Sequence, residues 1–169
     1  MTSLIGLTTS CFAKTDWGTF SDIGADGLLV TSLALPTYYQ DWQGLQQAGL
    51  TLLTSGAVVW VGKYSIAAER PDKSDFDSFP SSHTANAFAA AATLSQRYGW
   101  QIGLPSYTLA SLVGYARVKQ NKHHWHDVLA GAAIGVLSGV YFTSPAGVNI
   151  AVSPWSDGDS QGLNLSYQW

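Results

Sequence analysis

Cysteine is almost missing from this sequence of 169 residues, since Cys11 is the only one. A single cysteine excludes an intramolecular disulfide and any zinc site built on cysteine pairs. The sequence also has no internal repeat and no low-complexity linker, features that would indicate several units. A chain of this length can bury one substantial core. We therefore predict a single domain over residues 1–169.

Charge is also scarce. Charged residues make up 11% of the chain and hydrophobic residues 46%, whereas roughly 25% charged is typical. Charge-free runs cover 42–62, 98–116 and 128–156, but the strongly apolar part of the last one is only the segment 128–142. A helix of about 15 residues is roughly 22 Å long, less than the roughly 30 Å hydrocarbon layer of a membrane. The sequence therefore favours helices buried in a protein core over membrane spans.

The few basic residues are unevenly placed. A net charge of −3 and a pI near 5.6 argue against nucleic acid as a partner. Most of the Lys and Arg residues nevertheless fall between 63 and 122, namely Lys63, Arg70, Lys73, Arg97, Arg117, Lys119 and Lys122. An acidic protein with its cations gathered in the middle of the chain suits a small anionic ligand.

The N-terminal segment 1–20 has two interpretations. The stretch "LIGLTTSCFA" at 4–13 has the small residues found at the end of an export signal, but no basic region precedes it. It is either the remnant of a trimmed signal or an ordinary chain start.

Apolar residues at helical spacing predict five helices. They cover about 24–36, 43–69, 80–98, 104–118 and 123–142. Pro71 is expected to stop the second helix, because the residue before proline avoids helical geometry. The alternating residues 148–152 and 163–169 predict a β-hairpin within an appendage at 146–169. The predicted fold is mainly α, a compact bundle of about five to six helices with a small C-terminal hairpin.

Two segments predict an anion-binding site, one because it is cationic and the other because it begins a helix. Lys63 and Arg70 are seven residues apart, which places both on one face of a helix. They would repel each other unless an anion lies between them, although Glu69 could neutralise them. Ser81, Ser82 and His83 open the next helix, where free N–H groups and the helix dipole favour an anion.

The stretch "KQNKHHWHDVLAG" at 119–131 holds three of the four histidines. His123 and Asp127 are four residues apart at the start of an apolar helix. Asp127 can therefore accept a proton from one ring nitrogen of His123 and leave the other as a nucleophile. Arg117 can join them only if the helix breaks near Gln120-Asn121. A metal bound by these histidines is the alternative, but three cations around the pocket would oppose a divalent ion.

Together, Lys63-x6-Arg70-Pro71, Pro80-Ser81-Ser82-His83 and Arg117-x5-His123-x3-Asp127 resemble the three-part signature of the type 2 phosphatidic acid phosphatase superfamily. That superfamily includes bacterial class A acid phosphatases and vanadium haloperoxidases. Ser82 stands where the family usually has glycine, and Ala116 stands where it usually has serine. His124 and His126 match no catalytic position of the signature, and we expect them near the pocket or on the surface.

The resemblance implies a role for each matching residue. His123 would attack phosphorus and form a phosphohistidine, oriented by Asp127, while His83 would protonate the leaving oxygen and then activate water. A phosphate-binding set would hold the substrate: Lys63, Arg70, Ser81, Ser82 and Arg117. No metal and no cofactor is required.

The resemblance also implies a substrate class and a location. The substrate would be a phosphate monoester or diphosphate, soluble or lipid-linked, and the enzyme an exported one in the periplasm or cell envelope, either soluble or peripheral to the membrane. A vanadate-dependent haloperoxidase and a non-catalytic envelope module remain alternatives. The oligomeric state stays open.

Overall fold

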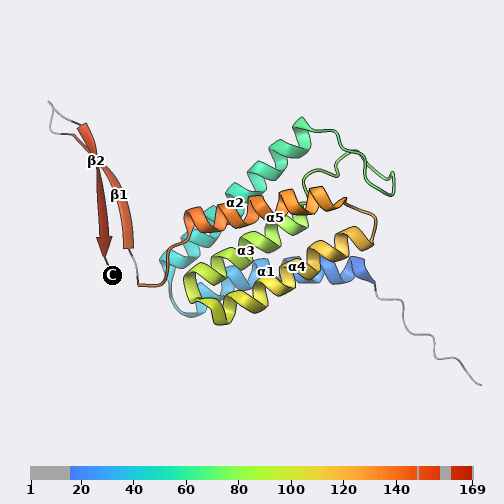
Figure 1. Cartoon of the computed structure of the whole chain (residues 1–169). Helices are drawn as coiled ribbons and strands as arrows, with labels where there is room; N and C mark the ends of the chain where they lie inside the picture. The colour runs from blue at the N-terminus through green and yellow to red at the C-terminus, as the bar shows by residue number, and fades with distance from the viewer. Residues whose placement is uncertain (1–15, 148, 157–160, 169) are drawn as a thin grey trace, which may run out of the picture.

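A computed structural model describes residues 16–147, 149–156 and 161–168. Its helices run alternately up and down, so that consecutive helices are antiparallel neighbours (Figure 1). They are α1 (Trp17–Tyr38), α2 (Trp42–Ser65), α3 (Ser82–Tyr98), α4 (Trp100–Lys119) and α5 (Trp125–Phe142). The mainly α prediction is confirmed, and each predicted helix is present. The possible signal segment at 4–13 lies outside the described residues.

Local capping explains where two helices begin. The Asp16 carboxylate accepts hydrogen bonds from the N–H groups of Gly18 and Thr19 at the start of α1. The Asp41 carboxylate does the same for the N–H of Gly44 at the start of α2. Asp is a favoured capping residue because its side chain satisfies N–H groups that have no partner inside the helix.

Helix α3 lies at the centre of the bundle and contacts all four other helices. It can do so because its many alanine side chains are small and let neighbouring helices approach closely. The fully buried alanines are Ala85, Ala87, Ala89, Ala90, Ala91 and Ala92. Helix α5 packs on it through Gly131, Gly135 and Gly139. A Cβ atom at Gly135 would lie 2.3 Å from the backbone oxygen of Ala85, so only glycine permits this approach.

The outer faces of the bundle are apolar, and this corrects one prediction. The segment 128–142 was expected to form a helix buried in a protein core, yet only 33% of α5 is buried. Leu137 is 69% exposed on α5 and Leu53 is 73% exposed on α2. By length and composition α5 could cross a membrane. Helices α1, α2 and α4 have 22, 24 and 20 residues and so extend beyond the most apolar stretches that the sequence indicated.

The far end of the bundle, where α3 ends, is closed by a buried ion pair. The guanidinium of Arg97 donates to both carboxylate oxygens of Asp41, at 2.7 and 2.5 Å. It also donates to the backbone oxygens of Ser144 and Pro145, each at 3.1 Å. This network joins the ends of α3 and α5 to the start of α2.

Two strands follow the last helix. β1 (Asn149–Ser156) and β2 (Gln161–Gln168) pair antiparallel, with Val152 opposite Leu165. In Figure 1 the pair lies beyond the far end of the bundle, and within the described residues it contacts no helix.

Candidate active site

The predicted site residues come from separate stretches of sequence that meet at the other end of the bundle. There α1 begins, α2 ends, α3 begins, α4 ends and α5 begins (Figure 1). Two connections complete this end, the segment 66–81 between α2 and α3 and the turn 120–124 between α4 and α5.

His123 lies in the turn between α4 and α5. Helix α4 ends at Lys119, and Asn121 adopts a positive φ of 56°, so the predicted break near Gln120-Asn121 is confirmed. The His123 side chain is 1% exposed, and its Nδ1 lies 2.7 Å from the backbone oxygen of Ser78. Because a carbonyl oxygen can only accept a hydrogen bond, Nδ1 carries the proton and Nε2 keeps a lone pair.

Asp127 does not orient His123 as the sequence suggested. Its Oδ2 lies 3.9 Å from Nδ1 of His123, beyond hydrogen-bond distance. Instead, Oδ2 accepts a hydrogen bond of 2.5 Å from the Ser78 hydroxyl and one of 2.7 Å from the backbone N–H of His124. Asp127 therefore positions His123 indirectly, by fixing Ser78, whose carbonyl holds the ring.

Ser78 is a site residue that the sequence analysis missed. It is fully buried, and it contacts His123 through its carbonyl and Asp127 through its hydroxyl. The sequence placed it at the end of a polar loop, and its only signal was its position two residues before Pro80.

Lys63 and Arg70 meet, but not on one helix. Helix α2 ends at Ser65, five residues earlier than Arg70 and well before Pro71, so the predicted helical face is wrong. The chain instead turns back, and Asp77 lies between the two cations. Nε of Arg70 is 2.7 Å from Oδ1 of Asp77, and Nζ of Lys63 is 3.7 Å from Oδ2 and donates to the Asp77 backbone oxygen. The neutralising carboxylate is Asp77 rather than Glu69.

Arg117 and His83 share a different carboxylate, that of Asp22 on α1. Nη1 of Arg117 lies 3.4 Å from Oδ1 of Asp22 and 3.3 Å from the Ser21 hydroxyl, both long contacts. Nε2 of His83 lies 3.1 Å from the same carboxylate oxygen. Arg117 is 7% exposed, and its Nε has no hydrogen-bond partner among the described residues. No sequence motif indicated a role for α1, because its acidic residues match none.

Ser81 and Ser82 open α3 as predicted, with Ser81 as the N-cap. The Ser81 hydroxyl lies 3.0 Å from that of Thr84, and the Ser81 backbone N–H donates to the backbone oxygen of Asp127. The Ser81 hydroxyl, which can both donate and accept, keeps capacity for a further hydrogen bond. Ser82 follows in the first turn, where helix N–H groups lack intrahelical partners.

The surroundings of His123 keep its ring neutral. Burial is the main cause that lowers its pKa to about 4; the Ser78 carbonyl opposes the shift, and the positive charges of Arg117, Lys63 and Arg70 add to it. Cations from the first and third predicted segments therefore act on the same imidazole. A neutral ring with a free Nε2 among three cations can attack an anionic electrophile.

The remaining histidines lie on the other side of Asp127. The side chains of His124 and His126 are 44% and 68% exposed, and one ligand atom from each of His124, His126 and Asp127 lies within 4.8 Å of the other two. This is the metal-ligand group that the structure offers within its described part. It leaves out His123, which the metal alternative also included.

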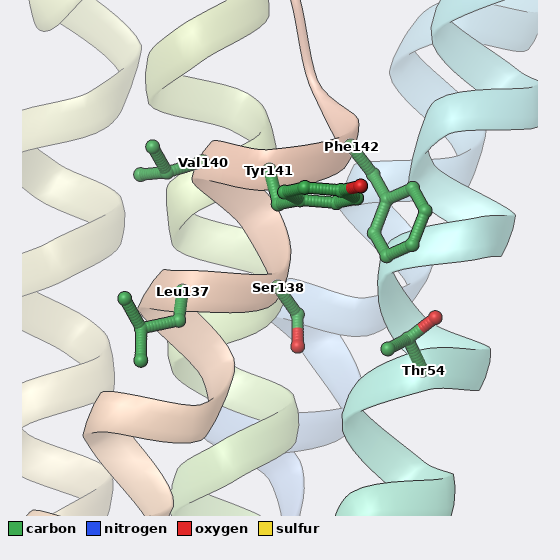
Figure 2. Close-up of a pocket in the computed structure, with 6 residues that line it drawn as sticks. All are labelled: Thr54, Leu137, Ser138, Val140, Tyr141 and Phe142. Atoms are coloured by element: carbon green, nitrogen blue, oxygen red, sulfur yellow. The ribbon is translucent and has the colours of Figure 1, made fainter.

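A groove of about 640 Å³ lies between α2 and α5, well away from these residues. Thr54, Leu137, Ser138, Val140, Tyr141 and Phe142 line it, and Figure 2 shows the two aromatic rings beside its upper edge. These lining residues include no Lys, Arg or His, so the groove is not the phosphate site.

Comparison with known proteins matches the part of the chain that contains the three predicted motif segments. The model of the PAP2 superfamily matches residues 43–147. A lipid A 1-phosphatase of Porphyromonas gingivalis is 36% identical over 70% of this chain, but the match covers only 28% of that protein's length. A lipid A 4'-phosphatase of Helicobacter pylori is 33% identical over 77% of this chain and 74% of its own.

Two solved structures have a similar fold. Aquifex aeolicus LpxE superposes with a TM-score of 0.66 at 25% identity, over 74% of this chain and 81% of that one. A transmembrane PAP2-type phosphatidylglycerolphosphate phosphatase of Bacillus subtilis gives a TM-score of 0.60 at 26% identity, over 75% of this chain and 72% of that one.

Proposed function

The chain belongs to the PAP2 superfamily, and on this premise we propose that it removes a phosphate group from a phosphorylated membrane glycolipid of the lipid A type. The relatives named above as lipid A phosphatases support this substrate class. The phosphate is transferred to His123 and then to water.

The observation that carries the proposal is the state of His123. Its Nδ1 is engaged by the Ser78 carbonyl at 2.7 Å, and its pKa is lowered to about 4. Nε2 is therefore an unprotonated nucleophile at neutral pH, and it already has the tautomer that attack requires. Three cations around a buried histidine have no evident structural purpose, but they would attract an anionic substrate to it.

In the proposed reaction, a bond forms between Nε2 of His123 and phosphorus while the bond from phosphorus to the lipid oxygen breaks. His83 gives its proton to that oxygen, and afterwards takes a proton from the water that cleaves the phosphohistidine. Lys63, Arg70 and Arg117 balance the charge on the phosphate oxygens, with Ser82 at the α3 N-terminus beside them. The chemistry takes place on these side chains without a metal ion.

The surface of the bundle supports a lipid substrate presented by a membrane. Helical residues 27–38, 42–62, 82–96, 98–116 and 128–142 contain no Asp, Glu, Lys or Arg. Large aliphatic side chains are exposed on the middle of the helices: Val30, Leu50, Leu53, Val58, Leu104, Leu112 and Leu137. Such a surface is unfavourable in water and favourable in lipid.

Aromatic residues are exposed at both ends of the same helices. Those at the site end are Trp60, Tyr64, Tyr115 and Trp125, and those at the far end are Tyr38, Tyr39, Trp42, Trp100 and Tyr141. Trp and Tyr favour the two membrane–water interfaces. We therefore propose that the bundle is embedded in the envelope membrane, with its site at one interface, where lipid phosphates lie. This replaces the expectation of a soluble or peripheral enzyme.

The test is a phosphate-release assay on the purified protein in detergent micelles, with lipid A and p-nitrophenyl phosphate as substrates. The wild type should release phosphate from lipid A in the presence of EDTA, and a rapid acid-free quench should trap a phosphoenzyme. His123→Ala should lose both the turnover and the phosphoenzyme. Turnover that survives in His123→Ala would disprove the mechanism.

A second arm of the assay separates the alternatives. Bromide oxidation by peroxide after vanadate loading would indicate a haloperoxidase. A folded protein that releases no phosphate from any lipid phosphate in a broad panel would indicate a non-catalytic module.

A further inference from the structure

The start of α5 carries two imidazoles that the proposed reaction does not use. His124 and His126 stack, with ring centroids 5.0 Å apart and an angle of 12° between the rings. Both approach the buried carboxylate of Asp127. Nδ1 of His124 lies 3.3 Å from Oδ2, and Nε2 of His126 lies 3.0 Å from Oδ1.

These distances are close to those of a metal-ligand set. A zinc ion bound tetrahedrally at about 2.0–2.1 Å places its ligand atoms roughly 3.3 Å apart. The two separations of 3.0 and 3.3 Å run to different oxygens of Asp127, and one ligand atom from each of the three residues lies within 4.8 Å of the other two. The His124 and His126 rings are nearly parallel, so the His124 side chain, which is 44% exposed, has to turn to bring all three ligand atoms around one ion.

A second observation concerns Asp127 itself. The residue is 0% exposed, yet its Oδ1 accepts no hydrogen bond from any described residue. The nearest group, Nε2 of His126, is at 3.0 Å but outside hydrogen-bonding geometry. A buried carboxylate oxygen without a donor is unfavourable. A metal ion in line with the two imidazoles would satisfy it.

The ring of His126 is also held in place, although it is exposed. It stacks on Phe79 on one side, with centroids 6.4 Å apart, and on His124 on the other. The ligand set has two neutral nitrogens and one carboxylate, which suits a zinc-class ion and leaves a fourth position for water. The nearby cation Lys63 is paired with Asp77.

We propose that His124, His126 and Asp127 bind a zinc-class transition-metal ion, and that the bound ion inhibits the phosphatase. Inhibition follows from the shared carboxylate. Oδ2 of Asp127 holds the Ser78 hydroxyl, and the Ser78 carbonyl holds the ring of His123. A bound ion withdraws electron density from the Asp127 carboxylate and moves this carboxylate. Both changes weaken the hydrogen bond to Ser78 and so the support for His123. The inhibition rests on the proposed function, whereas the binding does not.

Binding is tested first, on the full chain in detergent, by titration with Co²⁺. Tetrahedral Co²⁺ absorbs visible light much more strongly than the octahedral aquo ion does. We expect these bands in the wild type, and in His126→Ala a loss of affinity of about 100-fold, because one ligand of three is gone. His126→Asp, which restores an oxygen ligand, should recover part of the affinity. Absence of the bands in the wild type would overturn the proposal.

Inhibition is tested by adding Zn²⁺ to EDTA-treated, washed enzyme. We expect wild-type activity to fall by about tenfold or more and to return with EDTA, while His126→Ala keeps both its basal activity and its activity in zinc. Equal inhibition of both proteins would place the zinc effect on the substrate or elsewhere, and would overturn the proposal.

The two proposals fail in distinguishable ways. An EDTA-treated enzyme that is inactive until zinc is added would contradict both. An enzyme inactive under every condition would contradict the proposed function, and the Co²⁺ bands of wild type and His126→Ala would still decide whether the metal site exists.

Discussion

Arg97 and Arg117 are two nearly buried arginines at opposite ends of the bundle, with exposures of 6% and 7%. Arg97 donates to Asp41, Gln43, Ser144 and Pro145. Arg117 has only contacts of 3.3 and 3.4 Å, and its Nε has no hydrogen-bond partner within the described part of the chain. The two arginines are therefore equally buried, but only Arg97 has a full set of close hydrogen-bond acceptors.

The difference separates a structural cation from a ligand-binding one. A buried guanidinium needs acceptors, and Arg97 finds them all inside the protein. Arg117 keeps an Nε–H with no partner among the described residues, and phosphate oxygens of the proposed substrate would supply acceptors. The far end is therefore complete without a ligand, whereas the site end is not.

The largest effect is expected from breaking the complete end. Arg97→Met leaves the Asp41 carboxylate buried without its partner, which costs about 3–5 kcal/mol of stability. Thermal unfolding in detergent measures this loss, and the double variant Arg97→Met with Asp41→Asn should recover part of it. An Arg97→Met protein as stable as the wild type would show that the far end does not depend on the ion pair.

Arg117→Lys should have the opposite profile. The charge remains, but a lysine cannot reproduce the two-pronged contact of guanidinium with phosphate, so kcat/KM should fall by about 100-fold. The unfolding temperature should change little, because Arg117 makes only long contacts in the free protein. The matched control is Arg97→Lys, which should lose stability and keep kcat/KM per folded molecule. Identical profiles for the two lysine variants would remove the distinction between the ends.

Ser78→Ala should produce a smaller loss. Its carbonyl remains, but the hydroxyl that fixes Asp127 is gone, and we expect kcat to fall by about tenfold through loss of one charge-assisted hydrogen bond. If Asp127 acts through Ser78, adding Ser78→Ala to Asp127→Asn should cost almost nothing further. Additive losses in this cycle would mean that Asp127 acts on His123 directly.

A further prediction concerns pH. With its pKa lowered to about 4, native His123 should stay neutral as the pH falls through 6.5, where an unfolded histidine takes up a proton. The unfolded state then binds more protons than the native state between about pH 6.5 and 4, so stability declines over this window and no further below it. NMR titration of labelled histidine, with His123→Ala for assignment, measures this pKa. A midpoint near 6.5 would contradict the buried, cation-surrounded ring.

The sequence predicted the helices and the meeting of Lys63, Arg70, Arg117 and His123, because helical periodicity and motif order are local signals. It could not predict which partners the site residues choose. Asp77, Asp22 and Ser78 satisfy the cations and the histidine across 7 to 95 residues of chain, and such pairs leave no spacing pattern. The apolar runs predicted a core for the same reason, since hydropathy alone does not distinguish a face that contacts protein from one that contacts lipid.

The glycines on α5 have a consequence for how substrate range can evolve. Gly131 faces the Ser81 backbone at a distance that no side chain permits, so any larger residue there would force α3 and α5 apart. Variation that admits a larger or smaller lipid headgroup therefore has to arise on α1 and at the end of α2, where exposed side chains border the site.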